Sequence, residues 1–290
     1  MMYTLFYQNR NNELIDLFNI PDCVVTNVTG LGMVGKNGTF SKRADIDGEE
    51  LQALTYDKRT IQISYRLIGG QIGNQAVRRF IYNLFSEKKE KRLYYVDEKL
   101  KVYTDVIVEG VDSVIWSNTP SIVVSMVASN PFFRTEEIEN IVETIDGKFI
   151  FPLEIKETDI KNTLFGNVEK TSEYTIENDG HIESPLHFIL KIKSSSVVNP
   201  TIHLNGIGFF GLNKTFSSGD EIHIITKRGN KTVFMYDSDL NTVDLFSCIS
   251  SASQWLQLQT GENSFSVSSD TENADVSLKI LYEKLYIGVE

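Results

Sequence analysis

The sequence of 290 residues has only two cysteines, two tryptophans, four histidines and six prolines. No segment approaches the roughly 20 consecutive apolar residues that a membrane-spanning helix needs, so we expect no membrane insertion. The first residues lack a basic region followed by an apolar one, so the sequence predicts no secretory signal peptide. The low proline content and the aromatic content of 11% are unlike those of disordered chains, and they favour β structure.

The scarce cysteines and histidines also argue against a metal centre. Cys23 and Cys248 lie far apart in the sequence, and we expect small buried residues rather than a disulfide or half a metal site. No H-x-H or HExxH spacing occurs, so the sequence predicts no metal site and favours histidines that face solvent on strands. The four histidines are His181, His187, His203 and His223.

The net charge of −11 is spread over both halves of the chain. An acidic protein repels phosphate groups, which argues against specific nucleic-acid binding and against binding to anionic membranes. A basic cluster between Arg78 and Arg92 is the local exception. It is either a solvated helix face or a contact with another subunit.

A formal G-x-G-x-x-G pattern extends from Gly30 to Gly35. A dinucleotide site needs such a turn to open a helix, with an acidic ribose ligand about 20 residues further on. Here the next residues, Lys36 to Thr39, have the composition of another turn, and Asp47 and Glu49 follow too early. The sequence therefore predicts a glycine-rich loop and no cofactor.

Nothing in the sequence indicates catalysis. There is no G-x-S-x-G nucleophile motif, and the adjacent carboxylates Glu49-Glu50 and Glu136-Glu137 lie in predicted loops or acidic runs. A glycosidase needs two carboxyl groups held across a cleft, and no pattern here points to that arrangement. We predict a protein that is not an enzyme.

The first half of the chain predicts an antiparallel β domain with one packed helix, over residues 1–133. Arg59 to Leu67 alternates as a strand, with Ile61, Ile63, Tyr65 and Leu67 on one face. The period then changes, and a helix is predicted from about Asn74 to Glu87, with Val77, Phe80, Ile81, Leu84 and Phe85 on its buried face. Alternation returns until a final strand closes at Asn130-Pro131.

Residues 134–147 carry five carboxylates and one arginine, which predicts an acidic linker or a solvated connecting strand. Residues 148–290 then show β patterning to the end. Apolar residues alternate with polar ones at Leu186 to Ile192, Ile222 to Ile224 and Val276 to Tyr282, between glycine-containing turns. This spacing predicts a second domain that is a β-sandwich.

The strand, helix and strand order that closes on Ser129 to Phe132 resembles the N-terminal domain of the siphophage distal tail proteins (Dit), a family of siphovirus-type phage tail components. The second half matches the C-terminal domain of this family at scattered positions. These are Asn199 to Ile202, Gly219 to Ile222 with Gly229 to Lys231, Trp255 to Leu258 with Gly261 to Phe265, and Tyr282 to Val289. Together the two resemblances cover most of the chain.

The resemblance implies a galectin-like or carbohydrate-module-like fold for the C-terminal sandwich. It also implies a structural role at the virion tail tip, after synthesis in the bacterial host cytoplasm. Six copies would form a ring through their N-terminal domains, as a baseplate hub that joins the tail tube to the host-adhesion device and lets DNA pass through its lumen. The implied partners are the tail tube protein and a tail-associated hub or spike protein, with a receptor-binding protein as a further option.

A second hypothesis is a carbohydrate-binding adhesin module for host attachment. Sugars stack on exposed aromatic faces, although most aromatic residues of a sandwich belong to its core. We nominate Trp255 as the carbohydrate-binding residue. Exposed aromatics beside a groove would favour a saccharide, whereas a flat and polar surface would favour a protein partner.

Overall fold

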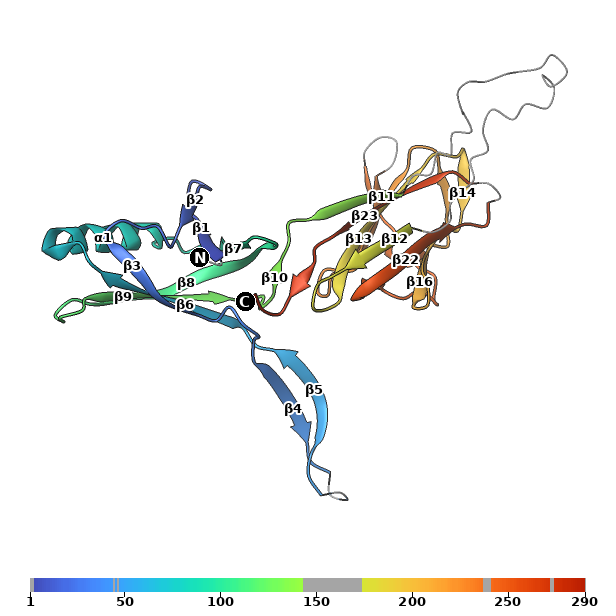
Figure 1. Ribbon diagram of the computed structural model, residues 1–290. Coiled ribbons are helices and arrows are strands. Elements are labelled where there is room, and N and C mark those ends of the chain that lie inside the picture. The colour runs from blue at the N-terminus through green and yellow to red at the C-terminus, as the bar shows by residue number, and fades with distance from the viewer. Residues whose placement is uncertain are drawn as a thin grey trace, which may run out of the picture. The chain divides into compact units, whose positions relative to one another are not determined.

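A computed structural model of the chain describes residues 3–43, 45, 47–142, 174–236, 241–271 and 274–289. The chain divides into two compact units. The first unit contains Met1–Glu136 together with Leu285–Glu290, and the second contains Glu137–Lys284. Figure 1 labels the elements of both units, which are described separately below.

The first unit is built from antiparallel strands and one α-helix. Its elements are β1 (Tyr3–Gln8), β2 (Leu14–Asp16), β3 (Cys23–Thr29), β4 (Lys36–Ser41), β5 (Glu50–Tyr56), β6 (Arg59–Leu67), α1 (Gly70–Leu84), β7 (Lys91–Asp97), β8 (Lys101–Val114), β9 (Ser121–Ala128), β10 (Phe133–Arg134) and β24 (Leu285–Tyr286). The main sheet has the order β2-β1-β7-β8-β9-β6-β3, and β10 joins it by pairing with both β8 and β24. Strands β4 and β5 form a separate two-stranded sheet.

The alternation predicted for Arg59–Leu67 is confirmed. Ile61, Ile63 and Tyr65 are fully buried, and Leu67 is 5% exposed. Strand β8 is long enough to serve two neighbours, because its first half pairs with β7 and its second half with β9. The inward side chains of these strands form one apolar core with α1.

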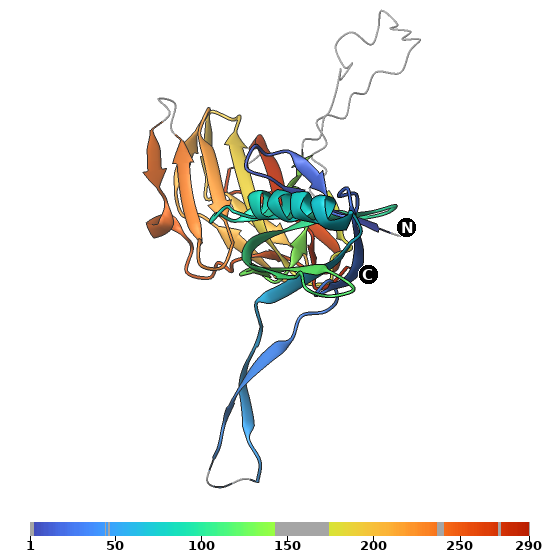
Figure 2. The ribbon, with the colours of Figure 1, turned by 90° about the vertical axis from the view of Figure 1, so that its left-hand side faces the viewer.

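Helix α1 lies over one face of this sheet (Figures 1 and 2). It runs from Gly70 to Leu84, which is earlier than the predicted bounds of Asn74 to Glu87. Val77 and Ile81 are buried as predicted, and Phe85 just beyond the helix packs edge-on against Tyr7 with ring centroids 4.8 Å apart. The prediction for Phe80 was wrong, because its side chain is 43% exposed. The face centred on Val77 and Ile81 turns Phe80 to the side.

The second unit contains β strands and one short 3-10 helix in its described part. Its elements are β11 (Ile138–Val142), β12 (Tyr174–Asn178), β13 (Ser184–Ile192), β14 (Ser196–Val198), β15 (Thr201–Leu204), β16 (Gly208–Gly211), β17 (Thr215–Ser217), β18 (Glu221–Ile225), β19 (Thr232–Tyr236), β20 (Thr242–Asp244), η1 (Phe246–Cys248), β21 (Gln257–Leu258), β22 (Gly261–Ser268) and β23 (Val276–Tyr282).

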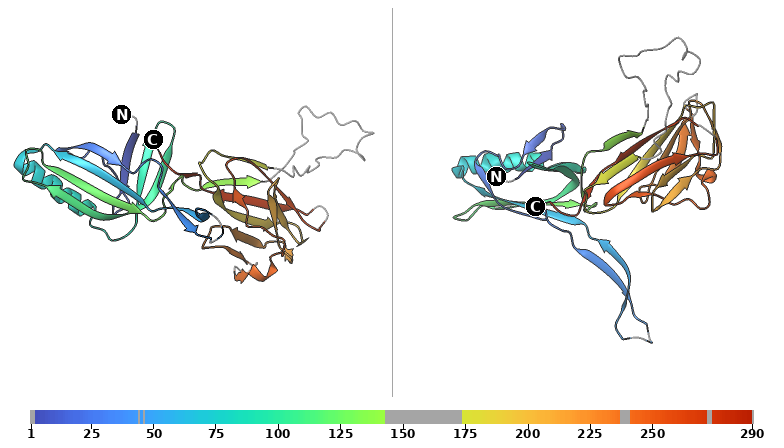
Figure 3. Two further views of the ribbon diagram at one scale, coloured as in Figure 1. Left: turned by 90° about the horizontal axis from the view of Figure 1, so that it is seen from below. Right: turned by 45° about the vertical axis from the view of Figure 1, so that its right-hand side comes forward.

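Two antiparallel sheets face each other in this unit (Figure 3). One has the order β11-β23-β13-β18-β19-β20, with β21 also paired to β13, and the other has the order β12-β22-β15-β16. Phe188 of the first sheet meets Phe265 of the second edge-on, with ring centroids 5.9 Å apart, inside a shared apolar core. The predicted sandwich and the inward face of Leu186 to Ile192 are thereby confirmed.

The division into units differs from the predicted one in two places. The predicted linker, residues 134–147, includes Arg134 of β10 and all of β11, whose Ile138 pairs with Tyr282 of β23; residues 143–147 lie outside the described residues. The last six residues belong to the first unit rather than to the sandwich. Pairing between strands far apart in the sequence produces both differences, and local composition does not reveal such pairing.

The described ranges contain no helix that is long and apolar enough to cross a membrane. Both cysteines are free thiols, and Cys23 is buried whereas Cys248 is half-buried.

Candidate functional site

The hairpin of β4 and β5 projects from the main sheet of the first unit (Figures 1 and 2). Nearly all of its residues are exposed on both strands. The sequence had indicated a turn at Lys36 to Thr39 and loops after it, and this prediction was wrong. A hairpin that buries neither face has no alternating pattern by which to recognise it.

One face of the hairpin is apolar. A Cβ atom on Gly38 would lie 2.7 Å from the Phe40 ring and 3.3 Å from Leu51, so these two side chains gather over the glycine. Leu54 is the cross-strand partner of Gly38 and lies on the same face. Phe40, Leu51 and Leu54 are all more than half exposed. Apolar side chains left exposed together in this way form a candidate contact surface.

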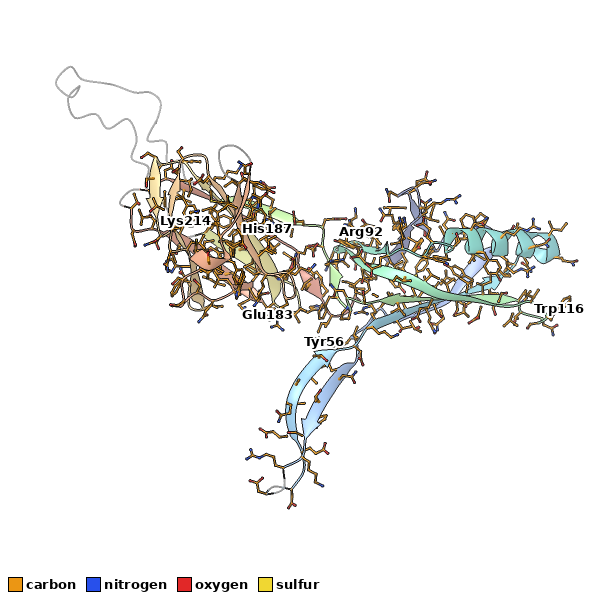
Figure 4. The ribbon with its side chains drawn as sticks, turned by 180° about the vertical axis from the view of Figure 1, so that it is seen from behind. Tyr56, Arg92, Trp116, Glu183, His187 and Lys214 are labelled. Atoms are coloured by element: carbon orange, nitrogen blue, oxygen red, sulfur yellow. The ribbon has the colours of Figure 1, made fainter. Side chains whose placement is uncertain are left out.

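The hairpin is held firmly at its base. Tyr56, labelled in Figure 4, packs edge-on against Phe132 with ring centroids 5.2 Å apart, and the Lys36 ammonium lies 5.2 Å from the Tyr56 ring centre. The Asn37 amide donates to the Asp57 carboxylate at 2.5 Å, and the Asp57 backbone N–H donates to Gly35 at 3.0 Å. A base fixed in this way gives the projecting strands a defined direction.

Arg59 is buried beside this base, at the start of β6. Its side chain is 2% exposed, and burial lowers its pKa to about 10. The guanidinium donates to four backbone carbonyl groups: Pro131 at 2.6 Å, Gly30 at 2.5 Å, Gly32 at 2.8 Å and Ile287 at 2.7 Å. It also lies 4.5 Å from the centre of the Phe133 ring. The side chain thus ties three segments of the first unit, around residues 30–32, 131 and 287, to β6.

This contact explains the glycine-rich segment. Gly30 has a φ of +88°, and a Cβ atom there would lie 2.0 Å from the Thr60 carbonyl oxygen. The segment therefore passes against β6 so closely that only glycine fits, and its carbonyl groups face Arg59. Beyond it the chain enters β4 rather than a helix. A shallow pocket of about 470 Å³ lies here, lined by Gly30, Gly32, Met33, Val34, Gly35, Asp57, Lys58, Arg59 and Thr60.

A second exposed apolar group lies at the turn between β8 and β9. Trp116, labelled in Figure 4, is 97% exposed, and its neighbours Val114 and Ile115 are 55% and 43% exposed. The backbone N–H of Leu67 donates to Pro120 at 2.9 Å, which brings this turn next to the chain that enters α1. Ile72 of the first helical turn is 85% exposed.

In the second unit, Trp255 is half-buried against an aromatic cluster. Its ring centroid lies 5.1 Å from that of Phe210, which is buried, and 6.1 Å from that of Phe246, which is 54% exposed. The Lys231 ammonium lies 5.2 Å from the Trp255 ring centre. The nominated residue therefore has one side in the core and another beside an exposed aromatic and a cation.

The histidines do not all face solvent as predicted. His223 on β18 is 8% exposed, because its ring stacks on Phe234 with the planes 1° apart and meets His187 of the neighbouring strand β13. Nε2 of His187, labelled in Figure 4, lies 3.0 Å from Nδ1 of His223, whose Nε2 lies 3.0 Å from Glu221. Burial lowers the pKa of His187 to about 4 and also lowers that of His223. His187, His223 and Glu221 thus form a hydrogen-bonded chain, and burial favours the neutral form of both imidazoles.

Metal binding requires a cluster of suitable side chains, and the described part of the chain contains no group of three or more histidine, cysteine, aspartate or glutamate residues that could hold a metal ion.

The sequence did not lead us to predict the projecting hairpin or the role of Arg59. The alternation along β6 could have indicated that Arg59 is buried, because Arg59 stands two residues before Ile61 and so shares its inward face. For the hairpin, composition held no comparable signal.

Comparison with known proteins gives two family matches. Residues 10–120 match the phage tail protein RIFT-related domain, and residues 179–286 match the C-terminal domain of the siphovirus-type tail component. No curated protein matches the chain in sequence.

Among solved structures, the fold is similar to the crystal structure of the Dit protein (gp 19.1) of phage SPP1, described as a paradigm of the hub adsorption apparatus in phages that infect Gram-positive bacteria. The TM-score is 0.62 at 14% identity, with 98% of this chain and 99% of that one covered. A chain of the phage p2 baseplate in its activated conformation with Ca matches at a TM-score of 0.46 and 16% identity, over 97% of this chain and 98% of that one. That second likeness is too distant to carry an argument.

Both family matches are to phage tail domains, they occur in the expected order, and the fold of a distal tail protein covers nearly the whole chain. The chain therefore belongs to the distal tail protein family of the siphophages and is a structural component of the phage tail and baseplate.

Proposed function

We propose that this protein is a ring-forming connector at the tip of a siphophage tail. Six copies close into a ring through their first units and join the tail tube to the host-adhesion device. DNA passes through the lumen of the ring. The copy number and the neighbours are those that the family resemblance implies, and the projecting hairpin is the single observation that carries the ring.

The hairpin supports a contact between copies because its strands stand apart from the main sheet and its apolar face is uncovered. A two-stranded hairpin is marginally stable in water unless it packs against something else. Here Phe40, Leu51 and Leu54 offer an apolar face, while the base is fixed by Tyr56 and Asp57. Laid across a neighbouring copy, this face would be covered, and repetition of the contact from copy to copy generates a ring if the rotation closes.

A head-to-tail contact needs a different surface on the receiving copy. The turn around Trp116 and the exposed Ile72 provide apolar area for it. Arg66, Arg78 and Arg79 lie in the same stretch of chain, and no carboxylate occurs between Arg59 and Ser86. The connection between β4 and β5 carries Asp45, Asp47 and Glu49 beside Lys42 and Arg43. Arg43 pairs with Asp45 and Glu50 there, so only a small excess of negative charge is left to attract the arginines of the receiving surface. The apolar faces therefore supply most of the proposed contact.

The net charge supports passage of DNA rather than its capture. An acidic chain with a charge of −11 repels the phosphate backbone, so a lumen lined by it would let DNA slide. We propose partners above and below the ring, namely the tail tube protein and a hub or spike protein, with a receptor-binding protein as a further one. Because the family is structural, we propose no catalytic role and no cofactor.

Native mass spectrometry of the full chain over a range of concentrations tests the ring. We expect hexamers at high concentration, since assembly follows mass action. Leu54→Asp places a charge on the apolar face of the hairpin and should shift the population to monomers. Thr39→Asp is the matched control, because Thr39 is also exposed on β4–β5 but pairs with Ala53 on the opposite face. Hexamers that survive Leu54→Asp unchanged would refute the role of the hairpin, and a stable assembly of another size would refute the copy number.

The second candidate function is binding of a host-surface saccharide by the second unit. Exposed Phe246 beside half-buried Trp255, with Lys231 at the ring, supports it, because a sugar can stack on an aromatic face while a cation meets its hydroxyl groups. A galectin-like character of the sandwich would agree with this function. It would make the protein an adhesin as well as a connector.

A glycan array probed with the full chain separates the two functions. If the saccharide function holds, binding should vanish in Trp255→Ala and be retained in part by Trp255→Phe, which keeps an aromatic face. Equal binding by both variants would rule out Trp255 as the contact. An array on which the wild-type chain binds nothing would leave the connector as the function of the whole protein.

A further inference from the structure

The last residues of the chain complete the first unit, although the 148 residues before them form the second. Strand β24 pairs with β10, so that Phe133 stands opposite Tyr286 and Arg134 opposite Leu285. After β24 the backbone N–H of Val289 donates to the Leu31 carbonyl group at 2.9 Å. The C-terminal segment, residues 285–289, is therefore bound to the first unit along its length.

This segment contributes to the apolar core. Tyr286 is 7% exposed and Val289 is 3% exposed, and both belong to the same buried cluster as Leu31 and Phe133. Between them, Gly288 lies so close to Gly32 that a Cβ atom on it would be 2.8 Å from the Gly32 carbonyl carbon and 2.9 Å from the Met33 nitrogen. The fit is backbone against backbone, and any side chain at position 288 would force the two segments apart.

Arg59 adds a polar requirement to the apolar one. One of its four carbonyl partners, Ile287, comes from the C-terminal segment, and the other three come from segments before residue 132. A buried guanidinium is costly unless its N–H groups are satisfied. Without residues 285–289 the arginine would lose an acceptor at the same time as the core loses Tyr286 and Val289.

We infer that the first unit reaches its native state only after the C-terminal segment has docked on β10 and Arg59. The segment is made only after the whole second unit has been synthesised. Until then the first unit is incomplete, with the edge of β10 that pairs with β24 left open. This order delays maturation of the hairpin-bearing unit until the second unit has been made. The inference concerns the folding of the first unit and holds whether or not that unit forms the proposed ring.

Ribosome-bound full-length chains test the order of folding. Both samples carry a C-terminal extension that occupies the ribosomal exit tunnel. The shorter extension leaves residues 285–290 inside the tunnel and exposes the chain through Lys284, whereas the longer one releases residues 285–290 as well. Brief proteolysis should cleave the first unit in the first sample and spare it in the second. The second unit should be protected in both samples. Equal protection of the first unit before and after release of the segment would overturn the inference.

The released full-length protein provides an independent test. Gly288→Ala should lower the thermal midpoint of the first unit by several degrees and should speed hydrogen exchange in β10 and β6. Gly110→Ala is the matched control, because Gly110 lies in β8 of the same unit and a Cβ atom there would meet nothing within 4 Å. Neither variant should move the midpoint of the second unit. A Gly288→Ala protein that melts and exchanges like Gly110→Ala would also contradict the inference.

Discussion

Removal of the Arg59 side chain should destabilise the first unit more than any other single polar substitution in β6. Arg59→Ala abolishes four hydrogen bonds from a charged donor and leaves the carbonyl groups of Pro131, Gly30, Gly32 and Ile287 without it. Each hydrogen bond to a charged group contributes about 1.5 to 3 kcal/mol net. The substitution also removes the unfavourable burial of a charge, which costs several kcal/mol and offsets part of this loss.

The balance is a net loss of about 3 to 5 kcal/mol, comparable with removing one partner of a buried ion pair. For a unit of this size that corresponds to a fall in the melting temperature of about 10 to 15 °C. Arg59→Lys should recover little, because an ammonium group has three donors on a flexible stem and cannot reproduce the planar fork of a guanidinium.

Calorimetry of the full chain, with hydrogen exchange to assign each transition to a unit, measures this effect. The control is Arg66→Ala, which removes the same side chain from the exposed face of the same strand and should change stability by less than about 0.5 kcal/mol. If Arg59→Ala and Arg66→Ala melted at the same temperature, Arg59 would not hold the three segments against β6. A fall in melting temperature confined to the second unit would also contradict the role of Arg59 in the first unit.

Two further predictions concern the helix and the histidine pair. Ile81→Ala should lower the free energy of unfolding by about 2 to 5 kcal/mol, because Ile81 is fully buried. Phe80→Ala should lower it much less, since the Phe80 ring is 43% exposed. Denaturant titration of both variants measures the two losses, and a larger loss for Phe80→Ala would contradict the observed helix face. The pKa of His187 is lowered from 6.5 to about 4 and that of His223 is lowered too, so the folded second unit favours neutral imidazoles. Its stability should be complete above pH 6.5 and decline as the pH falls towards 4, and His187→Gln should weaken this decline; identical pH profiles for wild type and variant would exclude the pair as its source.

Much of the core could be predicted from the sequence because burial on one face of a strand leaves a period of two. Ile61, Ile63 and Tyr65 in the first unit follow this period and are buried. In the second unit the same holds for Leu186, Phe188, Leu190 and Ile192. The helix was predicted with less accuracy. Its first turn, Gly70 to Gly73, contains two glycines, which local propensity places outside a helix, and the stripe of apolar residues was one position too wide at Phe80.

Solvent exposure was harder to predict than strand position. His223 stands on the outer face of its sheet, as alternation requires, yet the side chains of His187 and Phe234 on neighbouring strands cover it. Trp255 was nominated for its size and aromatic character, but the sequence held no information about Phe210 on one side and Phe246 on the other. Cross-strand neighbours decide how much of a sheet residue meets solvent, and register sets those neighbours.

The glycine-rich segment illustrates why the candidate site itself could not be derived. Its pattern from Gly30 to Gly35 is compatible with a phosphate-binding turn, a mobile loop or a close backbone contact, and local sequence does not distinguish these. The contact is made by Arg59, 29 residues further along the chain from Gly30, and by Gly288 and Val289 near the other end of the sequence. Gly30 and Gly288 are glycines for the same reason, since each passes too close to another backbone for a side chain. A buried arginine that is paired with backbone carbonyl groups instead of a carboxylate needs several chain segments to converge on it. Only the completed fold brings those segments together.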